Sequence, residues 1–511
     1  MDIFAFVLYF VAMITIGIFF LFKSKDVTEK DYFLGGRAMG PWVTAMSAQA
    51  SDMSAWLLMG LPGSILAFGF GQAWIGIGLA IGTAANWILV AKRLRKFSKA
   101  AGDSITLPQY LSNRFATKSH AVSIICAVVF LVCFTIYVAS AFVAGSDVFT
   151  TLVPSLSRTN AMIIFAAIVV IYTFLGGFNA VCWTDFFQGL LMICALLIVP
   201  IVIGFTRNLD TAALSTIYTG PNGEEFEFVA NFFNASWKDI VSGLGWGLGY
   251  FGMPHIIVRF MAIEKPSMVK KSAAVAIIWV VLSLAATIVI AYLGRMFVYS
   301  NGTDLSEVLL ANGKQSLIFV ELARDVFPAF IAGLLLAAII AASMSTADSQ
   351  LLVAASSFSS DLYKPIVRKN ASNKEMLWVS RIIVIVISVV AFFIASSKGK
   401  AAQAIMDLVS NAWGIFGAAF GPAVLFSLFW KRFTYKGAVA GIIAGALTDM
   451  LWLWLPVSNG QALTAITGIY EIIPGFFIGA LVAIVVTLID KAPSKEVESI
   501  FERATDNSID D

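Results

Sequence analysis

Two apolar stretches of this chain carry side chains whose oxygen atoms are suited to binding a cation. The first, AMSAQASDMSAWLLMGLPG at residues 45–63, holds Asp52 among serines, a glutamine, glycines and a proline. The second, AASMSTADSQLL at residues 341–352, places the hydroxyls of Ser345 and Thr346 next to each other. A hard cation prefers several oxygen ligands, which two hydroxyls and three backbone carbonyls would supply. The pattern therefore indicates a cation site.

Asp52 is the most unusual of these residues, because an ionisable side chain in the middle of a membrane helix faces a cavity or a polar partner. Gly60, Pro62 and Gly63 weaken the helix beyond it. Unwinding there would free backbone carbonyls, which can ligate a cation where they line a cavity. The alternative is a structural hydrogen bond from Asp52 to a neighbouring helix, and serines in membrane helices also bond to the preceding turn. We favour the functional interpretation.

A third stretch, GLGWGLGYFGMPHIIVRF at residues 243–260, points to a different chemistry. Trp246 and Tyr250 are four residues apart and would share one helix face. Neighbouring glycines leave room, and Pro254 interrupts the helix. An aromatic face beside exposed backbone suits a small solute that is part apolar and part charged, although plain aromatic packing is the alternative. Asp185, in CWTDFFQ, is a second-tier candidate because it stands near the start of another apolar segment.

The composition predicts the elements that must position these residues. Of 511 residues, 59% are hydrophobic and only 13% are charged, which is typical of a membrane protein and not of a soluble one. Apolar runs of about 20 residues, long enough to cross a bilayer as helices, recur along the chain. We predict an all-α polytopic membrane protein with about thirteen spans, near 3–22, 41–67, 72–91, 120–150, 160–177, 185–206, 239–261, 272–297, 327–356, 377–397, 403–430, 437–457 and 470–490.

The basic residues predict the orientation of the chain. Every second loop is rich in lysine and arginine, beginning with the loop that contains Lys23 and Arg37 and ending at Lys491 and Lys495. By the positive-inside rule these loops are cytoplasmic, so the N-terminus lies outside and the C-terminus inside. The charged tail, residues 491–511, is expected to be mobile and is given no role.

The span count is compatible with an internal structural repeat. Five spans from residue 41 and five more from residue 237 would enter the membrane from opposite faces, and each set opens with a segment interrupted by glycine and proline. The predicted division is therefore an N-terminal helix and first cytoplasmic loop (1–40), a first five-helix repeat (41–206), an extracellular loop (207–236), a second repeat (237–430), two C-terminal helices (431–490) and the tail (491–511).

Several motifs spread along the chain resemble those of one known family. SDMSAWLLMGLPG at 51–63, FTIYVASAFVAG at 134–145, MSTADSQLLVAASS at 344–357, WGIFGAAFGPAVLFSLFWKR at 413–432 and YEIIPGFFIGALV at 470–482 resemble the sodium/solute symporters, including the bacterial members that transport proline. The resemblance implies a LeuT-type core of inverted five-helix repeats, flanked by one N-terminal and two C-terminal helices. Gln49, Ala55 and Met253 depart from the pattern beside the expected cavity.

The resemblance also implies roles for individual residues. A sodium ion would be bound by backbone oxygens of Ala50, Met53 and Ala342 and by the hydroxyls of Ser345 and Thr346, while Asp52 and, as a second-tier candidate, Asp185 would serve sodium coupling. The solute pocket would use Ser54, Trp56, Gly60, Tyr137, Trp246, Tyr250 and Pro254, and Arg37 would act as a cytoplasmic gate.

The expected function is sodium-coupled uptake of L-proline by alternating access across a bacterial plasma membrane, with Na⁺ as the co-transported ion and no organic cofactor. A sodium symporter for another amino acid or a small carboxylate is the alternative, and a channel or a solute sensor is a weaker one. The sequence has no G-x-x-x-x-G-K-[ST] phosphate loop, H-E-x-x-H motif or nucleophile elbow, so neither ATP-driven transport nor an enzyme is predicted.

Overall fold

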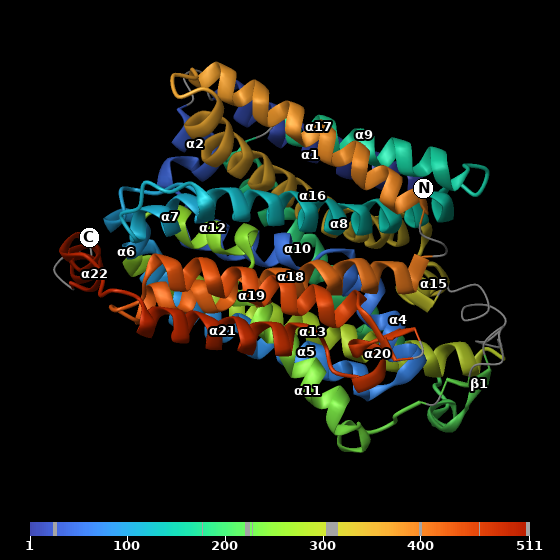
Figure 1. Ribbon diagram of the computed structural model, residues 1–511. Helices are drawn as coiled ribbons and strands as arrows, with labels where there is room; N and C mark the ends of the chain where they lie inside the picture. The colour runs from blue at the N-terminus through green and yellow to red at the C-terminus, as the bar shows by residue number, and fades with distance from the viewer. Residues whose placement is uncertain are drawn as a thin grey trace.

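The long helices of this protein lie side by side in one bundle, and the two chain ends stand at opposite ends of that bundle (Figure 1). The structure is a computed structural model. It describes residues 1–23, 28–175, 177–219, 225–226, 228–302, 315–397, 401–458 and 460–506.

The bundle is built mainly from long helices. They are α1 (Asp2–Lys23), α5 (Phe70–Ala85), α8 (Ala121–Leu152), α9 (Arg158–Leu175), α10 (Phe178–Thr206), α13 (Val269–Ser300), α16 (Ala329–Ser356), α17 (Asn373–Ser397), α18 (Ala401–Phe429), α19 (Tyr435–Trp454) and α21 (Ile472–Ile489). Shorter helices are α2 (Glu29–Leu34), α3 (Pro41–Asp52), α4 (Leu61–Phe68), α6 (Lys92–Ala100), α7 (Leu107–Arg114), α11 (Trp237–Gly245), α12 (Pro254–Ala262), α15 (Ile318–Val326), α20 (Leu463–Thr467) and α22 (Lys495–Thr505). Two small antiparallel ribbons pair β1 (Tyr218–Thr219) with β2 (Glu225–Phe226), and β3 (Pro456–Ser458) with β4 (Gln461–Ala462).

The helices have the length and composition of membrane spans. Within the described residues, ten are long and apolar enough to cross a bilayer, and Trp56–Phe68 and Arg158–Phe174 form two shorter apolar helices. The expected all-α polytopic architecture is therefore confirmed. The total of thirteen spans remains a prediction, because it also counts short and interrupted segments.

Two helices run further than hydropathy predicted. The span expected to end at residue 91 continues through the π-helical turn η3 (Asn86–Ala91) into the basic helix α6. The span expected to end at residue 356 continues through a second π-helical segment, η10 (Ser357–Val367). In α6, hydropathy falls where lysine and arginine begin, but both are good helix formers, so the helix outlasts the apolar run. The composition of η10, with three serines and Pro365, does not explain its helical geometry.

The first predicted interruption is a true break in the helix. α3 ends at Asp52, and Met53 leaves helical geometry with φ −85° and ψ 77°. The chain resumes as the π-helix η2 (Trp56–Gly60), which leads directly into α4. Asp52 is therefore the last residue of a helix inside the bundle. The Met53 amide still donates to the Gln49 carbonyl at 2.9 Å, and the helical pattern ends after it.

The second interruption stands at the matching position of the later five-helix set. α11 tightens into the 3₁₀-helix η6 (Trp246–Phe251), and Met253 is extended, with φ −81° and ψ 108°. Pro254 then begins α12. Proline disfavours helical geometry in the residue before it and needs no hydrogen bond at the first turn, so it ends one helix and starts the next. The division into repeats and flanking segments remains a prediction.

α5 packs against the second interruption at backbone contact. A Cβ added to Gly82 would lie 2.4 Å from the Gly247 carbonyl oxygen, and one added to Gly78 would lie 2.2 Å from that of Gly243. Only glycine permits such an approach, which is how small residues let membrane helices pack closely. This contact fixes the position of η6, and hence of its aromatic side chains.

The C-terminal tail is ordered where it was expected to be mobile. α22 packs against α6, with the rings of Phe97 and Phe501 5.3 Å apart. Arg114 donates a hydrogen bond to the Val497 carbonyl at 3.2 Å. The expectation of a mobile tail is wrong for α22, because its apolar face has a partner; residues 507–511 lie outside the described residues.

We predict that Gly82→Val lowers the free energy of unfolding by about 1–3 kcal/mol, because the added side chain must displace backbone. Gly204→Val is the matched control, since a Cβ at that helical position meets nothing within 4 Å. Thermal unfolding of the purified proteins measures the difference. Equal melting temperatures for the two variants would show that α5 and η6 are not in backbone contact.

Candidate cation and solute site

The broken end of α3 is held against the middle of α16 by a hydrogen bond. The Ser345 hydroxyl donates to the Ala50 carbonyl at 2.8 Å and lies 3.2 Å from the Ala342 carbonyl oxygen. All three residues are fully buried. Three of the five oxygens expected to bind a cation thus lie together, because the carbonyl oxygens of Ala50 and Ala342 are both within hydrogen-bonding distance of the Ser345 hydroxyl.

The two other expected ligands lie next to this junction in the chain. Thr346 is 1% exposed, and its hydroxyl oxygen has no hydrogen-bond partner among the described residues. A buried polar atom without a partner is costly, and a bound ion would compensate it. Met53 stands at the helix break, where its backbone is free of helical geometry. The donor set contains only neutral oxygens, which suits a monovalent hard cation carried as cargo.

Asp52 supplies negative charge at the same place. It ends α3, where the helix dipole is also negative, so an ionised carboxylate here requires a donor or a cation nearby. One donor is Tyr250, whose hydroxyl gives a 2.5 Å hydrogen bond to Asp52 Oδ2. The bond ties α3 to η6, so Tyr250, which was assigned to the solute pocket, also contacts the carboxylate assigned to cation coupling.

Asp185 belongs to a second buried polar cluster, on the same faces of α3 and α16. Its Oδ2 accepts hydrogen bonds from Ser47 at 2.7 Å and from Arg259 at 3.1 Å. Arg259 also donates to Ser349 and, at 2.5 Å, to the His255 carbonyl. Asp185 and Arg259 are at most 1% exposed, so this ion pair joins α3, α10, α12 and α16 away from water.

Arg259 is a residue that sequence reasoning missed. It is the sole arginine of the predicted span 239–261, which was signal enough to expect a buried acidic partner. Asp348, beside Ser349, is also fully buried, and neither of its carboxylate oxygens has a hydrogen-bond partner among the described residues. When both aspartates are ionised, one guanidinium faces two carboxylates, and the excess negative charge favours a cation nearby.

Aromatic rings gather around Trp246. The Trp56 ring stacks on one side at 5.6 Å between centroids and the Tyr470 ring lies at 5.0 Å. Trp413 donates from its indole to the Trp246 carbonyl at 2.8 Å, and its ring packs edge-on against Tyr250 at 5.1 Å. Trp413 and Tyr470 were missed as site residues. Both lie in the family motifs quoted above, but their spacing alone gave no sign that they meet Trp246.

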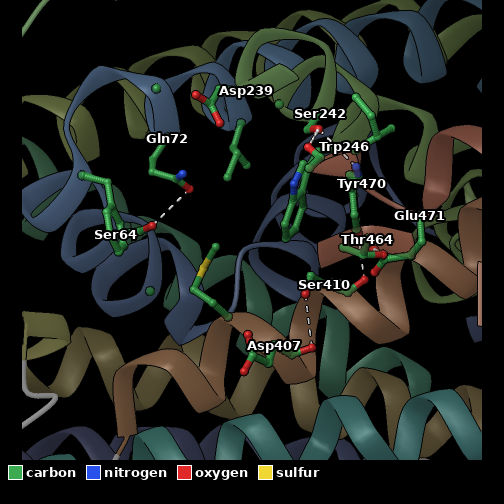
Figure 2. A pocket seen from close by; sticks show the side chains of 18 of the residues that line it. Ser64, Gln72, Asp239, Ser242, Trp246, Asp407, Ser410, Thr464, Tyr470 and Glu471 are labelled. Atoms are coloured by element: carbon green, nitrogen blue, oxygen red, sulfur yellow. Dashed lines mark hydrogen bonds between the residues drawn. The ribbon is translucent and has the colours of Figure 1, made fainter. Parts of the chain in front are cut away.

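A cavity of about 420 Å³ opens above these rings, at the end of the bundle that carries α11 and α20. Figure 2 shows Trp246 and Tyr470 on one wall and Ser64 with Gln72 on the opposite one. Of the expected solute residues, Gly60 and Trp246 line this cavity. The remaining five are not among its lining residues: Ser54, Trp56, Tyr137, Tyr250 and Pro254.

Those five residues are buried nearby. Ser54 accepts a hydrogen bond from the Trp56 amide at 3.2 Å, and the Tyr137 hydroxyl lies beside the Ser54 side chain. Pro254 begins α12 just after the second interruption. The structure thus gathers the expected solute residues around the two helix breaks. Most of them lie behind the aromatic wall of the cavity that Trp246 and Tyr470 form.

Acidic side chains also line this cavity. Asp239, Asp407 and Glu471 line it and are labelled in Figure 2. A cleft lined by one sign of charge raises the local concentration of the opposite ion. This arrangement favours cations inside the cavity.

Arg37 lies at the other end of the bundle and ties several segments together. Its guanidinium donates to the Met261 carbonyl at the end of α12, to Ser98 at 3.1 Å and to the Ser104 carbonyl at 2.8 Å. Asp103 faces its Nε at 2.8 Å. Burial lowers the pKa of Arg37 to about 10, with a further contribution from a nearby positive charge, so it remains charged at neutral pH.

Comparisons with known proteins agree with this geometry. The fold, with its two interrupted helices, is that of the LeuT-type transporters, as the solved structures that it matches show. A solved structure of a Na⁺-coupled sialic acid symporter in a substrate-bound outward-open state matches 96% of this chain and 98% of its own, with a TM-score of 0.75 at 19% identity. Mhp1, a nucleobase-cation-symport-1 family transporter, matches 92% and 98%, with a TM-score of 0.54 at 13% identity.

The sequence comparison defines the family. Residues 32–445 match the model of the sodium:solute symporter family. The sodium/proline symporter of Escherichia coli is 42% identical, over 98% of this chain and 95% of its own. The high-affinity proline transporter PutP of Bacillus subtilis is 41% identical, over 96% of this chain and 98% of its own.

The chain belongs to the sodium:solute symporter family and is a multi-pass membrane protein with bacterial relatives. The expected family and LeuT-type fold are confirmed; the roles of individual residues stay predictions.

We predict that Arg259→Met lowers the free energy of unfolding by about 3–5 kcal/mol, because it leaves Asp185 buried without its cation. The double variant Arg259→Met/Asp185→Leu removes both charges and is expected to recover most of that loss. Thermal unfolding in one detergent compares the two. A double variant as unstable as the single one would mean that the ion pair is not what holds these helices together.

Proposed function

We propose that this protein is a secondary active transporter that carries L-proline into the cell together with Na⁺ by alternating access. The observation that carries the proposal is the contact of the Ser345 hydroxyl of α16 with the broken end of α3, in a chain 42% identical to a sodium/proline symporter. Na⁺ is the co-transported ion of the family, so it is cargo and not a resident cofactor.

The sodium ion would bind where the Ser345 hydroxyl now bonds to the Ala50 carbonyl. Ala50, Met53 and Ala342 would offer backbone oxygens, and Ser345 and Thr346 their hydroxyls. The Ser345 hydroxyl donates to the Ala50 carbonyl, and the Thr346 hydroxyl has no partner among the described residues, so both oxygens could turn to a cation. Binding would pull the non-helical segment after Asp52 onto α16 and fix its backbone geometry. Asp52 would add favourable negative charge.

The solute would bind next, beside the two helix breaks. Trp246 lines one wall of the cavity and would meet the apolar ring of proline, with Trp56, Tyr137 and Tyr250 behind it. Ser54, Gly60 and Pro254 lie at the breaks themselves, where irregular backbone offers polar groups to the charged part of a zwitterion. Because Tyr250 bonds to Asp52, ordering of the sodium site also orders this wall of the solute site.

The two ends of the bundle would act as alternating gates. We assign the open cavity with its acidic lining residues to the extracellular side, and the hydrogen bonds of Arg37 to the cytoplasmic side. Basic residues of α6 and the neighbouring loops support this orientation by the positive-inside rule, with the N-terminus outside and the C-terminus inside. Arg37 would hold the cytoplasmic end closed until the repeats rock.

The driving force is sufficient for uphill transport. One charge moving through 100 mV releases about 2.3 kcal/mol, and a tenfold sodium gradient adds roughly 1.4 kcal/mol. Together they support accumulation of a neutral zwitterion by a factor of roughly 500. One sodium ion per proline is assumed, and the cycle then moves one net positive charge inward.

Uptake into proteoliposomes tests the function. We expect radiolabelled L-proline to accumulate only when an inward electrochemical gradient of Na⁺ is imposed, and most strongly when the Na⁺ gradient is combined with a negative interior. Potassium in place of sodium, and empty liposomes, are the controls. Competition by other amino acids and small carboxylates identifies a different solute. Flux that only equilibrates proline, whatever the sodium gradient, would indicate a channel and contradict the proposal.

We predict that Ser345→Ala and Thr346→Ala each raise the sodium concentration for half-maximal uptake about tenfold, since each removes one charged-group contact. Ser343→Ala is the matched control, because the Ser343 hydroxyl bonds to the Ile339 carbonyl of its own helix at 2.9 Å. Uptake is measured against sodium at fixed proline. Unchanged sodium dependence in both variants would move the cation site elsewhere.

A further inference from the structure

A basic cavity of about 220 Å³ lies at the α22 end of the bundle, away from the cation and solute site. Three separate segments form it: α6, the loop that joins α12 to α13, and α22. Its charged lining residues are Arg95, Lys96, Lys99, Glu264, Lys265 and Arg503. Five basic side chains therefore face one acidic one, in a space that none of the roles above uses.

Arg95 gives the cavity a buried donor. The residue is only 5% exposed. Its Nε donates to the Ile263 carbonyl at 2.6 Å and its Nη2 to the Glu264 carbonyl at 2.9 Å, whereas its Nη1 has no hydrogen-bond partner among the described residues. A buried donor without an acceptor is costly, so an anion oxygen that reached this nitrogen would be stabilised.

The outer part of the cavity carries unneutralised charge. Lys99, Lys265 and Arg503 are exposed, and none of them forms an ion pair within the part of the chain that the structure describes. Other basic residues at this end, such as Lys431, do pair with carboxylates of α22. Lys99, Lys265 and Arg503 therefore add positive charge beside the cavity that no described carboxylate neutralises.

We propose that this cavity binds a phosphate-bearing anion. A guanidinium with a free donor edge and several lysines is the combination that recognises phosphate oxygens, because arginine fixes the geometry and lysines add positive charge. The headgroup of an anionic lipid and a soluble phosphate share this chemistry, and the cavity stands at the end of the bundle where basic residues favour an anionic membrane surface.

A bound phosphate group would fasten α6, α22 and the loop after α12 to one another. Arg95 already holds the end of α12 through two carbonyls, and Arg37 bonds to Met261 in the same segment. The ligand therefore stabilises the arrangement in which this end of the bundle is closed. The binding claim does not rest on the transport of proline, so failure of either proposal leaves the other testable.

Lipid retention by the purified full-length protein tests the binding. Native mass spectrometry compares phosphatidylglycerol with phosphatidylcholine, at equal lipid concentration, on three proteins. The test variant is Lys99→Gln/Lys265→Gln/Arg503→Gln. The matched control, Lys374→Gln/Lys491→Gln/Lys495→Gln, removes the same charge from exposed residues that do not line the cavity. We expect the wild type to bind phosphatidylglycerol in preference to phosphatidylcholine. The test variant should bind phosphatidylglycerol at least about tenfold more weakly, and the control variant as tightly as the wild type.

A second arm separates the two sources of phosphate. Melting temperatures are measured with inorganic phosphate and with chloride at equal ionic strength, in detergent without added lipid. A stabilisation by phosphate that the test variant loses supports a soluble anion as the ligand, and lipid retention without that stabilisation supports a headgroup. The proposal is overturned if phosphate gives no specific stabilisation and, in addition, phosphatidylglycerol either binds all three proteins equally or is lost equally by both variants.

Discussion

The hydrogen bond between the Ser345 hydroxyl and the Ala50 carbonyl is the contact on which the rest of this structure depends. It joins a helix that stops inside the bundle to one that runs unbroken through it. The stop leaves Asp52 at a negative helix end and Met53 outside helical geometry, which is unfavourable in an apolar surrounding unless something compensates. The surrounding fold supplies partial compensation, from Ser345 and from Tyr250, and leaves the Thr346 hydroxyl without a partner among the described residues.

The proposed coupling between ion and solute would follow from the short separation of the two predicted sites. Asp52 belongs to the broken end of α3, and its hydrogen-bond donor Tyr250 belongs to η6, whose Trp246 reaches the open cavity. A change in the order of the α3 break is transmitted to the aromatic wall through one hydrogen bond. The close backbone contact of α5 with η6 keeps that wall from shifting independently, so the two sites share a common geometry.

The sequence predicted the parts of this protein that hydropathy and helix breakers determine. Long apolar runs gave the all-helical bundle, and the glycine and proline positions gave both interruptions. The resemblance to the family predicted that backbone oxygens of Ala50 and Ala342 lie close to the Ser345 hydroxyl. It did not predict partners that meet only through tertiary packing, such as Arg259 with Asp185, or Trp413 and Tyr470 with Trp246. α22 was missed because a short charged helix gives no hydropathy signal until its apolar face finds α6.

The most direct test of the central claim is a pair of high-resolution structures of the purified protein, one in sodium chloride and one in choline chloride. The account predicts density for an ion in sodium alone, about 2.3–2.6 Å from the Ala50 carbonyl and the Ser345 and Thr346 hydroxyls. It also predicts that the segment after Asp52 becomes better ordered in sodium. An ion bound elsewhere, with the Ser345–Ala50 hydrogen bond identical in both salts, would contradict it.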